Sequence, residues 1–162
     1  MIILYAASTL HHSLVLPSRP YRVLRKIDHI SVFLLIAGSY TPICVISLRE
    51  SGGMTLLLII AIVMVLGIAF KALWINCPRY VSSIIYIAMG WLVVFNITKV
   101  YQALDPTGFY LLLAGGIFYT IGGIIYALKF SINRDWGYHE IFHIFILLGT
   151  LCHYLMIYFY VA

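Results

Sequence analysis

Six long apolar segments follow one another along the chain, separated by short polar stretches. They fall at about 1–16, 28–48, 54–74, 81–100, 109–129 and 138–161. A helix that crosses a bilayer needs about 20 apolar residues, and all but the first segment reach that length. Apolar residues run on without interruption, whereas the strands of a membrane β-barrel would alternate. The pattern therefore predicts an all-α, polytopic membrane bundle of six spans, forming a single integral membrane domain over 1–162.

The first segment, 1–16, is shorter than a full span and ends at Pro17. It has neither the basic start nor the small-residue cleavage site of a signal peptide. We interpret it as the second half of a helical hairpin whose first half is missing. The basic stretch 17–27 is predicted to be a loop, and Pro42 is expected to kink the span that follows.

Two glycine pairs in the fifth segment predict close helix packing. Gly115–Gly116 and Gly122–Gly123 recur after seven residues and so return to the same side of a helix. Small residues on one side of a membrane helix let a neighbouring backbone approach closely.

Composition agrees with the pattern and excludes a water-soluble domain. The chain is 64% hydrophobic and 9% charged, whereas soluble domains carry about 25% charged residues. The net charge of +5 does not indicate nucleic-acid binding, because the basic residues lie in short loops between spans. The three cysteines, Cys44, Cys77 and Cys152, are scattered and are interpreted as small core residues. Lys71, near the end of a span, is interpreted as a snorkelling anchor.

The basic residues also predict an orientation. Arg49 and Lys99 follow the second and fourth spans, and the other eight follow the first, third and fifth. By the positive-inside rule the larger group is cytoplasmic. The larger group consists of Arg19, Arg22, Arg25, Lys26, Lys71, Arg79, Lys129 and Arg134.

Ionisable residues in the last span are the first candidates for chemistry. His139, Glu140, His143 and His153 lie in a segment that is otherwise apolar, and such residues inside a membrane are expensive and often functional. His139 and His143 are four residues apart, so on a helix their Cβ atoms lie about 6 Å apart on one side. Two imidazoles at this spacing can share one metal ion.

The predicted orientation brings further polar residues to the same depth. His12 and Asp28 lie at the cytoplasmic ends of their spans, as His139 and His143 do. A catalytic zinc site takes three protein ligands and a water, which His12, His139 and His143 would complete. Ser8, one turn before His12, and Asp28 are the candidate catalytic residues. Water bound to Zn²⁺ has a pKa near 7, so it would attack a lipid acyl or amide carbonyl at neutral pH.

A structural role for these histidines stays open. The pair His139 and His143 is a weak motif by itself, and two histidines in a span can hydrogen-bond across helices. His11 points about 100° away from His12, so we expect packing rather than ligation. His153 lies about 15 Å along the helix from His143 and is expected to hydrogen-bond a neighbouring helix.

Four stretches carry a resemblance to a known family. They are YAASTLHHS, RKIDHISVFLLIAGSYTP, YIAMGWL and HEIFHIFILLGTLCH. Their order and spacing resemble the hemolysin III branch of the progestin and adipoQ receptor superfamily over nearly the whole chain. The resemblance implies a seven-helix fold with zinc near the cytoplasmic ends of the helices. It also implies that the family motifs fall on Ser8 and His12, on Asp28, and on His139 and His143.

The resemblance frames the expected function. It implies a zinc-dependent hydrolase of lipid amides such as ceramide, or of lipid esters, that serves membrane-lipid homeostasis in the bacterial inner membrane. The family's first helix is absent, so we expect either a fragment or a misassigned start. Expected partners are membrane lipids, with no nucleic acid and no protein partner. The alternatives are a non-enzymatic haemolysin-like pore, which would cause cytolysis, and a sensor or receptor of small lipids.

Overall fold

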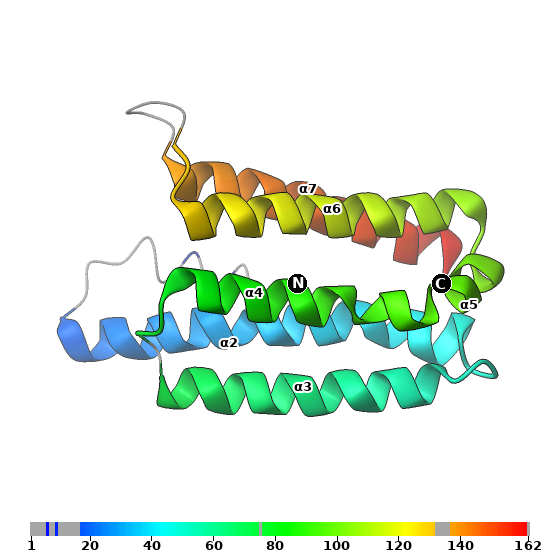
Figure 1. Ribbon diagram of the computed structural model, residues 1–162, viewed down its shortest axis with the longest axis horizontal. Coiled ribbons are helices and arrows are strands. Elements are labelled where there is room, and N and C mark those ends of the chain that lie inside the picture. The colour runs from blue at the N-terminus through cyan, green and yellow to red at the C-terminus, as the bar shows by residue number, and fades with distance from the viewer. Residues whose placement is uncertain (1–5, 7–8, 10–16, 75, 132–136, 162) are drawn as a thin grey trace.

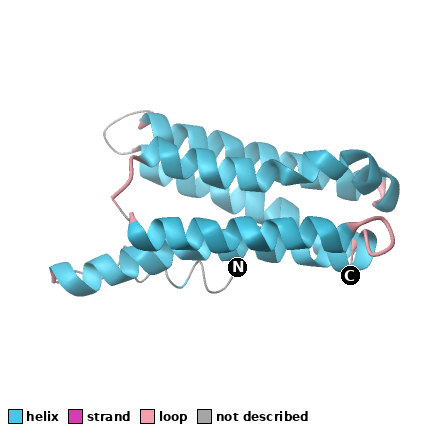
Figure 2. Cartoon of the chain, turned by 60° about the horizontal axis from the view of Figure 1, so that its bottom comes forward, coloured by secondary structure: helices cyan, strands magenta, loops and turns pink. Residues whose placement is uncertain are grey.

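The computed structural model describes residues 6, 9, 17–74, 76–131 and 137–161, and every regular element in these ranges is helical (Figures 1 and 2). The all-α class is therefore confirmed. The helices are α2 (Ser18–Pro42), α3 (Gly53–Leu73), α4 (Arg79–Gly90), α5 (Ile97–Ala103), α6 (Pro106–Leu128) and α7 (Tyr138–Tyr160).

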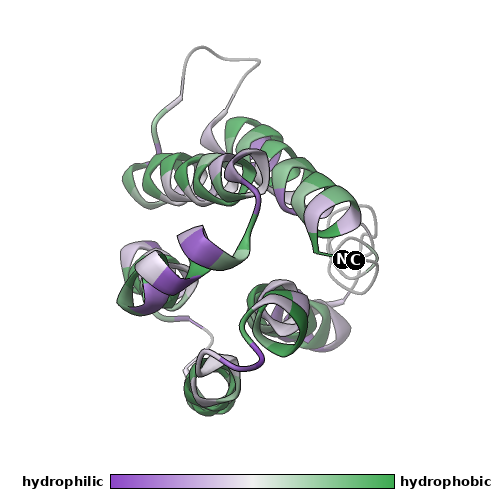
Figure 3. Cartoon of the chain, turned by 90° about the vertical axis from the view of Figure 1, so that its right-hand side faces the viewer, coloured by the Kyte–Doolittle hydropathy of each residue, from purple (hydrophilic) through white to green (hydrophobic). Residues whose placement is uncertain are grey.

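Within the described residues, five helical segments are long and apolar enough to cross a membrane. The predicted span at 1–16 lies outside the described residues except for positions 6 and 9. Seen along their axes, the helices are mostly apolar in colour, as a bilayer requires (Figure 3). The five segments are Arg19–Ser47, Gly53–Leu73, Arg79–Ala103, Pro106–Leu128 and Tyr138–Tyr160.

Helix α2 begins at Ser18, so the prediction of a loop over 17–27 is wrong. Pro20 lies in the first turn, where a helix tolerates proline because the N–H has no helical acceptor. The residues after it are good helix formers, and two of them bond to the last turn of α3 and to the connection that follows it. Arg25 Nη1 donates to Asn76 Oδ1 at 3.3 Å, and Lys26 Nζ donates to the carbonyl of Ala72 at 2.9 Å. These bonds join the start of α2 to the end of α3.

The regular helix gives way close to Pro42, where a kink was expected. Pro42 is the last residue of α2, and a wider π turn over Ile43–Ser47 follows it. Proline removes one backbone donor and clashes with the preceding turn, which explains the change of winding here.

The glycine pairs of α6 pack against two different helices. Gly115 and Gly122 lie against α7, Gly123 lies against α4, and Gly116 faces Trp91 just after α4. A Cβ added at these four positions would meet, in that order, His153, Phe145, Ile87 and Trp91. The prediction of close packing is confirmed at Gly115, Gly122 and Gly123, whereas Gly116 makes only an ordinary contact. Helix α6 lies alongside α7 for most of its length (Figure 1).

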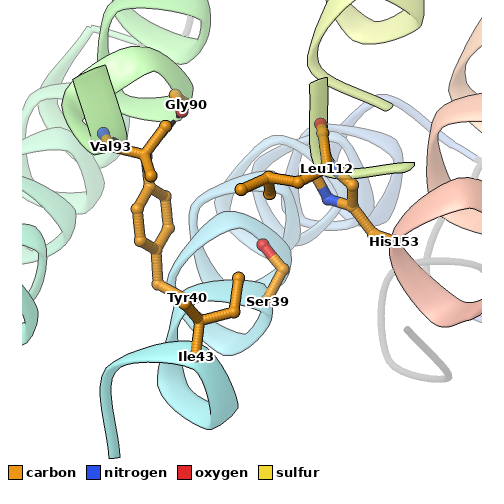
Figure 4. Close-up of a pocket in the computed structure, with 7 residues that line it drawn as sticks. All are labelled: Ser39, Tyr40, Ile43, Gly90, Val93, Leu112 and His153. Carbon is orange, nitrogen blue, oxygen red and sulfur yellow. Dashed lines mark hydrogen bonds between the residues drawn. The ribbon is translucent and has the colours of Figure 1, made fainter. Parts of the chain in front are cut away.

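Tyr40 of α2 forms hydrogen bonds at the junction between α4 and the 3-10 turn Trp91–Asn96. Its hydroxyl donates to the carbonyl of Gly90 at 2.6 Å and accepts from the amide N–H of Val93 at 2.9 Å (Figure 4). The hydroxyl thus bonds to backbone groups on both sides of the point where the winding changes. A cavity of about 20 Å³ lies between Tyr40 and His153, which is room for one water.

We expect Tyr40→Phe to destabilise the protein by about 2 kcal/mol, because it removes two hydrogen bonds made by a buried hydroxyl. The measurement is the free energy of unfolding in detergent micelles. Tyr110→Phe is the matched control, since the Tyr110 side chain is exposed. Equal stabilities of the two variants would contradict this role of Tyr40.

The basic side chains gather at one end of the bundle, called the basic end below. The start of α2, the end of α3, the start of α4, the end of α6 and the start of α7 meet there (Figure 1). Arg49 and Lys99 belong to the opposite end. The basic end carries Arg19, Arg22, Arg25, Lys26, Lys71, Arg79 and Lys129.

Candidate functional site

The first two turns of α7 bring His139 and His143 together at the basic end. Their ring centroids lie 4.5 Å apart and their planes are inclined by 75°. The prediction that both project from one side of a helix is confirmed. Zinc binds histidine nitrogens at about 2.0–2.1 Å, so the two ligand nitrogens on one ion lie about 3.3 Å apart. Rings at the observed separation fit two ligands of a single ion.

Aromatic side chains lie around His139. The ring centroid of Tyr126, from α6, lies 6.3 Å from that of His139 and 5.0 Å from that of Phe142. Tyr138 precedes His139 on α7, and their ring centroids lie 6.4 Å apart. The histidine therefore lies among aromatic rings from α6 and α7.

Asp28 lies on the same end of the bundle as the histidine pair. It is half-buried on α2 and close enough to interact electrostatically with Tyr86 and Tyr126. The ring centroid of Tyr126 in turn lies 6.3 Å from that of His139. The shared depth of Asp28 and His139 stays a prediction.

The remaining predicted site residues, Ser8 and His12, lie outside the described residues. Within the ranges that the structure covers, no group of three or more His, Cys, Asp or Glu side chains could hold a metal ion. The pair His139 and His143 needs a third ligand, and His12 stays a prediction for that position.

Arg79 belongs to this region, although the sequence interpretation gave it no role beyond orientation. Its guanidinium carbon lies 4.8 Å from the ring centroid of Tyr138 and 5.6 Å from that of Tyr126. These are cation–π distances, which stabilise a charge in a partly desolvated place. The sequence feature that points to Arg79 is the occurrence of a basic residue and two tyrosines at one predicted depth in the membrane.

Lys71 is buried, so the interpretation as a snorkelling anchor is wrong. Its side chain is 2% exposed and turns inward. The Nζ atom donates to Ser82 Oγ at 2.6 Å and to Cys77 Sγ at 3.1 Å, and those two acceptors lie 3.2 Å apart. Cys77 is thus part of a polar cluster rather than a plain packing residue. The cluster ties the end of α3 to the start of α4.

We expect Ser82→Ala to cost about 2 kcal/mol of stability, because it removes an oxygen acceptor from a buried amino group. Lys71→Met removes that amino group while keeping the volume of the side chain. The double variant is therefore expected to be more stable than Ser82→Ala alone. Unfolding of all three variants in detergent forms a double-mutant cycle. Additive effects would show that the two side chains act separately.

His153 lies in the other half of α7 and takes no part in the histidine pair. Its Nε2 is 3.2 Å from the carbonyl oxygen of Leu112 on α6, to which a protonated Nε2 donates (Figure 4). The expected hydrogen bond to a neighbouring helix is confirmed. This residue therefore serves as a histidine control for the experiments below.

Comparison with known proteins gives the chain its relatives. The family model described as haemolysin-III related matches residues 1–154. Hemolysin-3 of Bacillus cereus is 40% identical over 162 residues, covering 99% of this chain and 71% of the relative. A hemolysin-3 homolog of Bacillus subtilis (strain 168) is 36% identical over 160 residues, covering 99% of this chain and 73% of the relative. No solved structure matches the chain. The extent of these matches shows that the chain belongs to the haemolysin III family.

Proposed function

We propose that this membrane protein is a zinc-dependent hydrolase of lipid amides or esters, with His12, His139 and His143 as the metal ligands. The observation that carries the proposal is the 4.5 Å separation of the His139 and His143 rings at an end of the bundle that also holds Asp28. Ionisable side chains clustered at one depth of a membrane helix bundle are costly to keep and usually mark function.

The proposal gives each of these protein residues a role. A bound zinc ion supplies Lewis acidity, which polarises a carbonyl and acidifies a water molecule. Asp28 accepts the proton of the attacking water and later delivers it to the leaving amine or alcohol, as a general base and acid does. Ser8 donates its hydroxyl hydrogen bond to the reacting carbonyl oxygen. Tyr126 keeps the imidazole of His139 in orientation through its ring contact.

The location of the site follows from charge. With the basic end at the cytoplasmic face, most Lys and Arg residues lie on the side that the positive-inside rule requires. The protein then lies in the bacterial inner (cytoplasmic) membrane, and its site opens to lipids of the inner leaflet. Hydrolysis of such lipids is a route to membrane-lipid homeostasis.

A second candidate function is membrane permeabilisation, which is favoured by the name hemolysin-3 carried by the relatives. The described spans do not favour it. They are apolar enough to remain in a bilayer permanently, with mean hydropathies of 1.8 to 2.8. A pore-former that is secreted and then inserts needs an amphipathic segment instead.

The two functions are separated by one reconstitution. The protein is placed in dye-loaded liposomes, with and without prior removal of zinc by a chelator, and fatty-acid release and dye leakage are both measured. We expect zinc-dependent fatty-acid release without leakage. Leakage that survives alanine at all three histidines, without fatty-acid release, would overturn the hydrolase and support the pore.

A further inference from the structure

A cation beside the histidine pair lacks an oxygen partner among the described residues. Arg79 is the first residue of α4, and its Nη1 is buried with no hydrogen-bond acceptor in the part of the chain that the structure describes. Leaving one buried donor unpaired costs about 1–3 kcal/mol, so such a group calls for an explanation.

The two tyrosine rings near Arg79 stabilise its charge, but they do not provide a hydrogen-bond acceptor for its buried Nη1. Tyr126 and Tyr138 stabilise the charge of the guanidinium through cation–π contacts. Neither hydroxyl accepts a hydrogen bond from the buried Nη1. Nη1 therefore lacks an acceptor among the described residues, and a negatively charged oxygen is the acceptor that a guanidinium binds most strongly.

We propose that Arg79 binds the phosphate oxygens of an anionic membrane lipid, and that this lipid is the substrate of the histidine site. The second part rests on the proposed function. Basic pockets between membrane helices at the cytoplasmic side are where anionic headgroups bind. Arg22 and Arg25 at the same end add positive potential that attracts such lipids to this face.

The depths of the residues match the shape of such a lipid. Arg79 contacts Tyr138 in the first turn of α7, and His143 lies about 7 Å further along that helix. The acyl carbonyls of a phospholipid lie deeper in the bilayer than its phosphate. A headgroup bound at Arg79 therefore directs an acyl carbonyl of the same lipid toward the histidine pair. A lipid without a phosphate lacks this anchor.

The binding test measures headgroup preference without relying on activity. Purified protein in phosphatidylcholine membranes receives nitroxide-labelled phosphatidylglycerol or phosphatidylcholine, and electron paramagnetic resonance gives the fraction of immobilised lipid. We expect the wild type to prefer the anionic lipid about fivefold. Arg79→Gln is expected to remove this preference, and Arg79→Lys to keep only part of it, because lysine lacks the planar pair of donors.

The control is Arg22→Gln, which removes one positive charge from an exposed side chain at the same end. It is expected to keep most of the preference. A thermal unfolding curve for each variant shows that a lost preference does not come from a lost fold. Equal preference in the wild type and Arg79→Gln would overturn the proposal. Displacement of the labelled lipid by inorganic phosphate would overturn the lipid as the ligand.

A second experiment, which measures fatty-acid release, distinguishes failure of this inference from failure of the proposed function. We expect Arg79→Gln to slow fatty-acid release from phosphatidylglycerol at least tenfold and to leave release from phosphatidylcholine unchanged. Equal slowing on both lipids would overturn the role of Arg79 in substrate choice. A wild type that binds through Arg79 but releases no fatty acid from any lipid would contradict the hydrolase and still support the binding site.

Discussion

Replacing His143 with alanine is expected to lower bound zinc from about one ion per chain to less than a tenth, and to slow lipid hydrolysis at least 100-fold. Changes to residues that merely support a metal ligand already cost about 10–100-fold in affinity or activity, so loss of a ligand costs more. The remaining two ligands cannot complete the three-residue set that a catalytic zinc site uses. Metal analysis of the purified protein and a fatty-acid release assay measure both effects.

The matched control for this variant is His153→Gln. Position 153 lies on the same helix, and glutamine can still donate to the carbonyl of Leu112. Its zinc content and activity are expected to stay near the wild-type values. Full zinc content in His143→Ala, or equal loss in both variants, would remove His143 from the metal site.

A methyl group at Gly115 is expected to destabilise the bundle by about 3 kcal/mol, whereas the same change at Gly116 is harmless. A Cβ at Gly115 would overlap Cδ2 of His153 and would lie 3.1 Å from the carbonyl oxygen of Gly149. At Gly116 the nearest atom is 3.7 Å away, on Trp91, which is an ordinary contact. Both changes raise helix propensity equally, so the difference isolates packing between α6 and α7.

Thermal inactivation and zinc content of Gly115→Ala and Gly116→Ala measure this difference. Because α7 carries the histidine pair, a shift of α7 away from α6 should also separate His139 from Tyr126. We therefore expect Gly115→Ala to lose zinc below its unfolding temperature. Identical behaviour of the two variants would show that the close contact at Gly115 does not position α7.

Features that repeat along one helix were predictable from the sequence. The spacing of His139 and His143 determines their common side once the segment is helical, and the ring distance agrees with it. The glycines of α6 were predictable for the same reason, although their division between α4 and α7 was not. Adjacent glycines point about 100° apart, and only the arrangement of neighbouring helices decides what each one meets.

Features that depend on neighbouring helices were missed or mistaken. Lys71 looked like a snorkelling residue because it ends a span, but Ser82 and Cys77 offer acceptors inside the bundle. Arg79 looked like one more positive charge in a loop, and its place between two tyrosines depends on how α6 and α7 pack against α4. The basic charge of segment 17–27 predicts a loop, but most of its residues are good helix formers and α2 begins at Ser18.

Convergence of His12 with His139 and His143 is the central claim, and X-ray absorption at the zinc edge of the purified protein tests it most directly. The account predicts three nitrogen ligands at about 2.0–2.1 Å with one further oxygen, and one nitrogen fewer in His12→Ala. An ion bound by sulfur at about 2.3 Å, or an unchanged spectrum in His12→Ala, would contradict it.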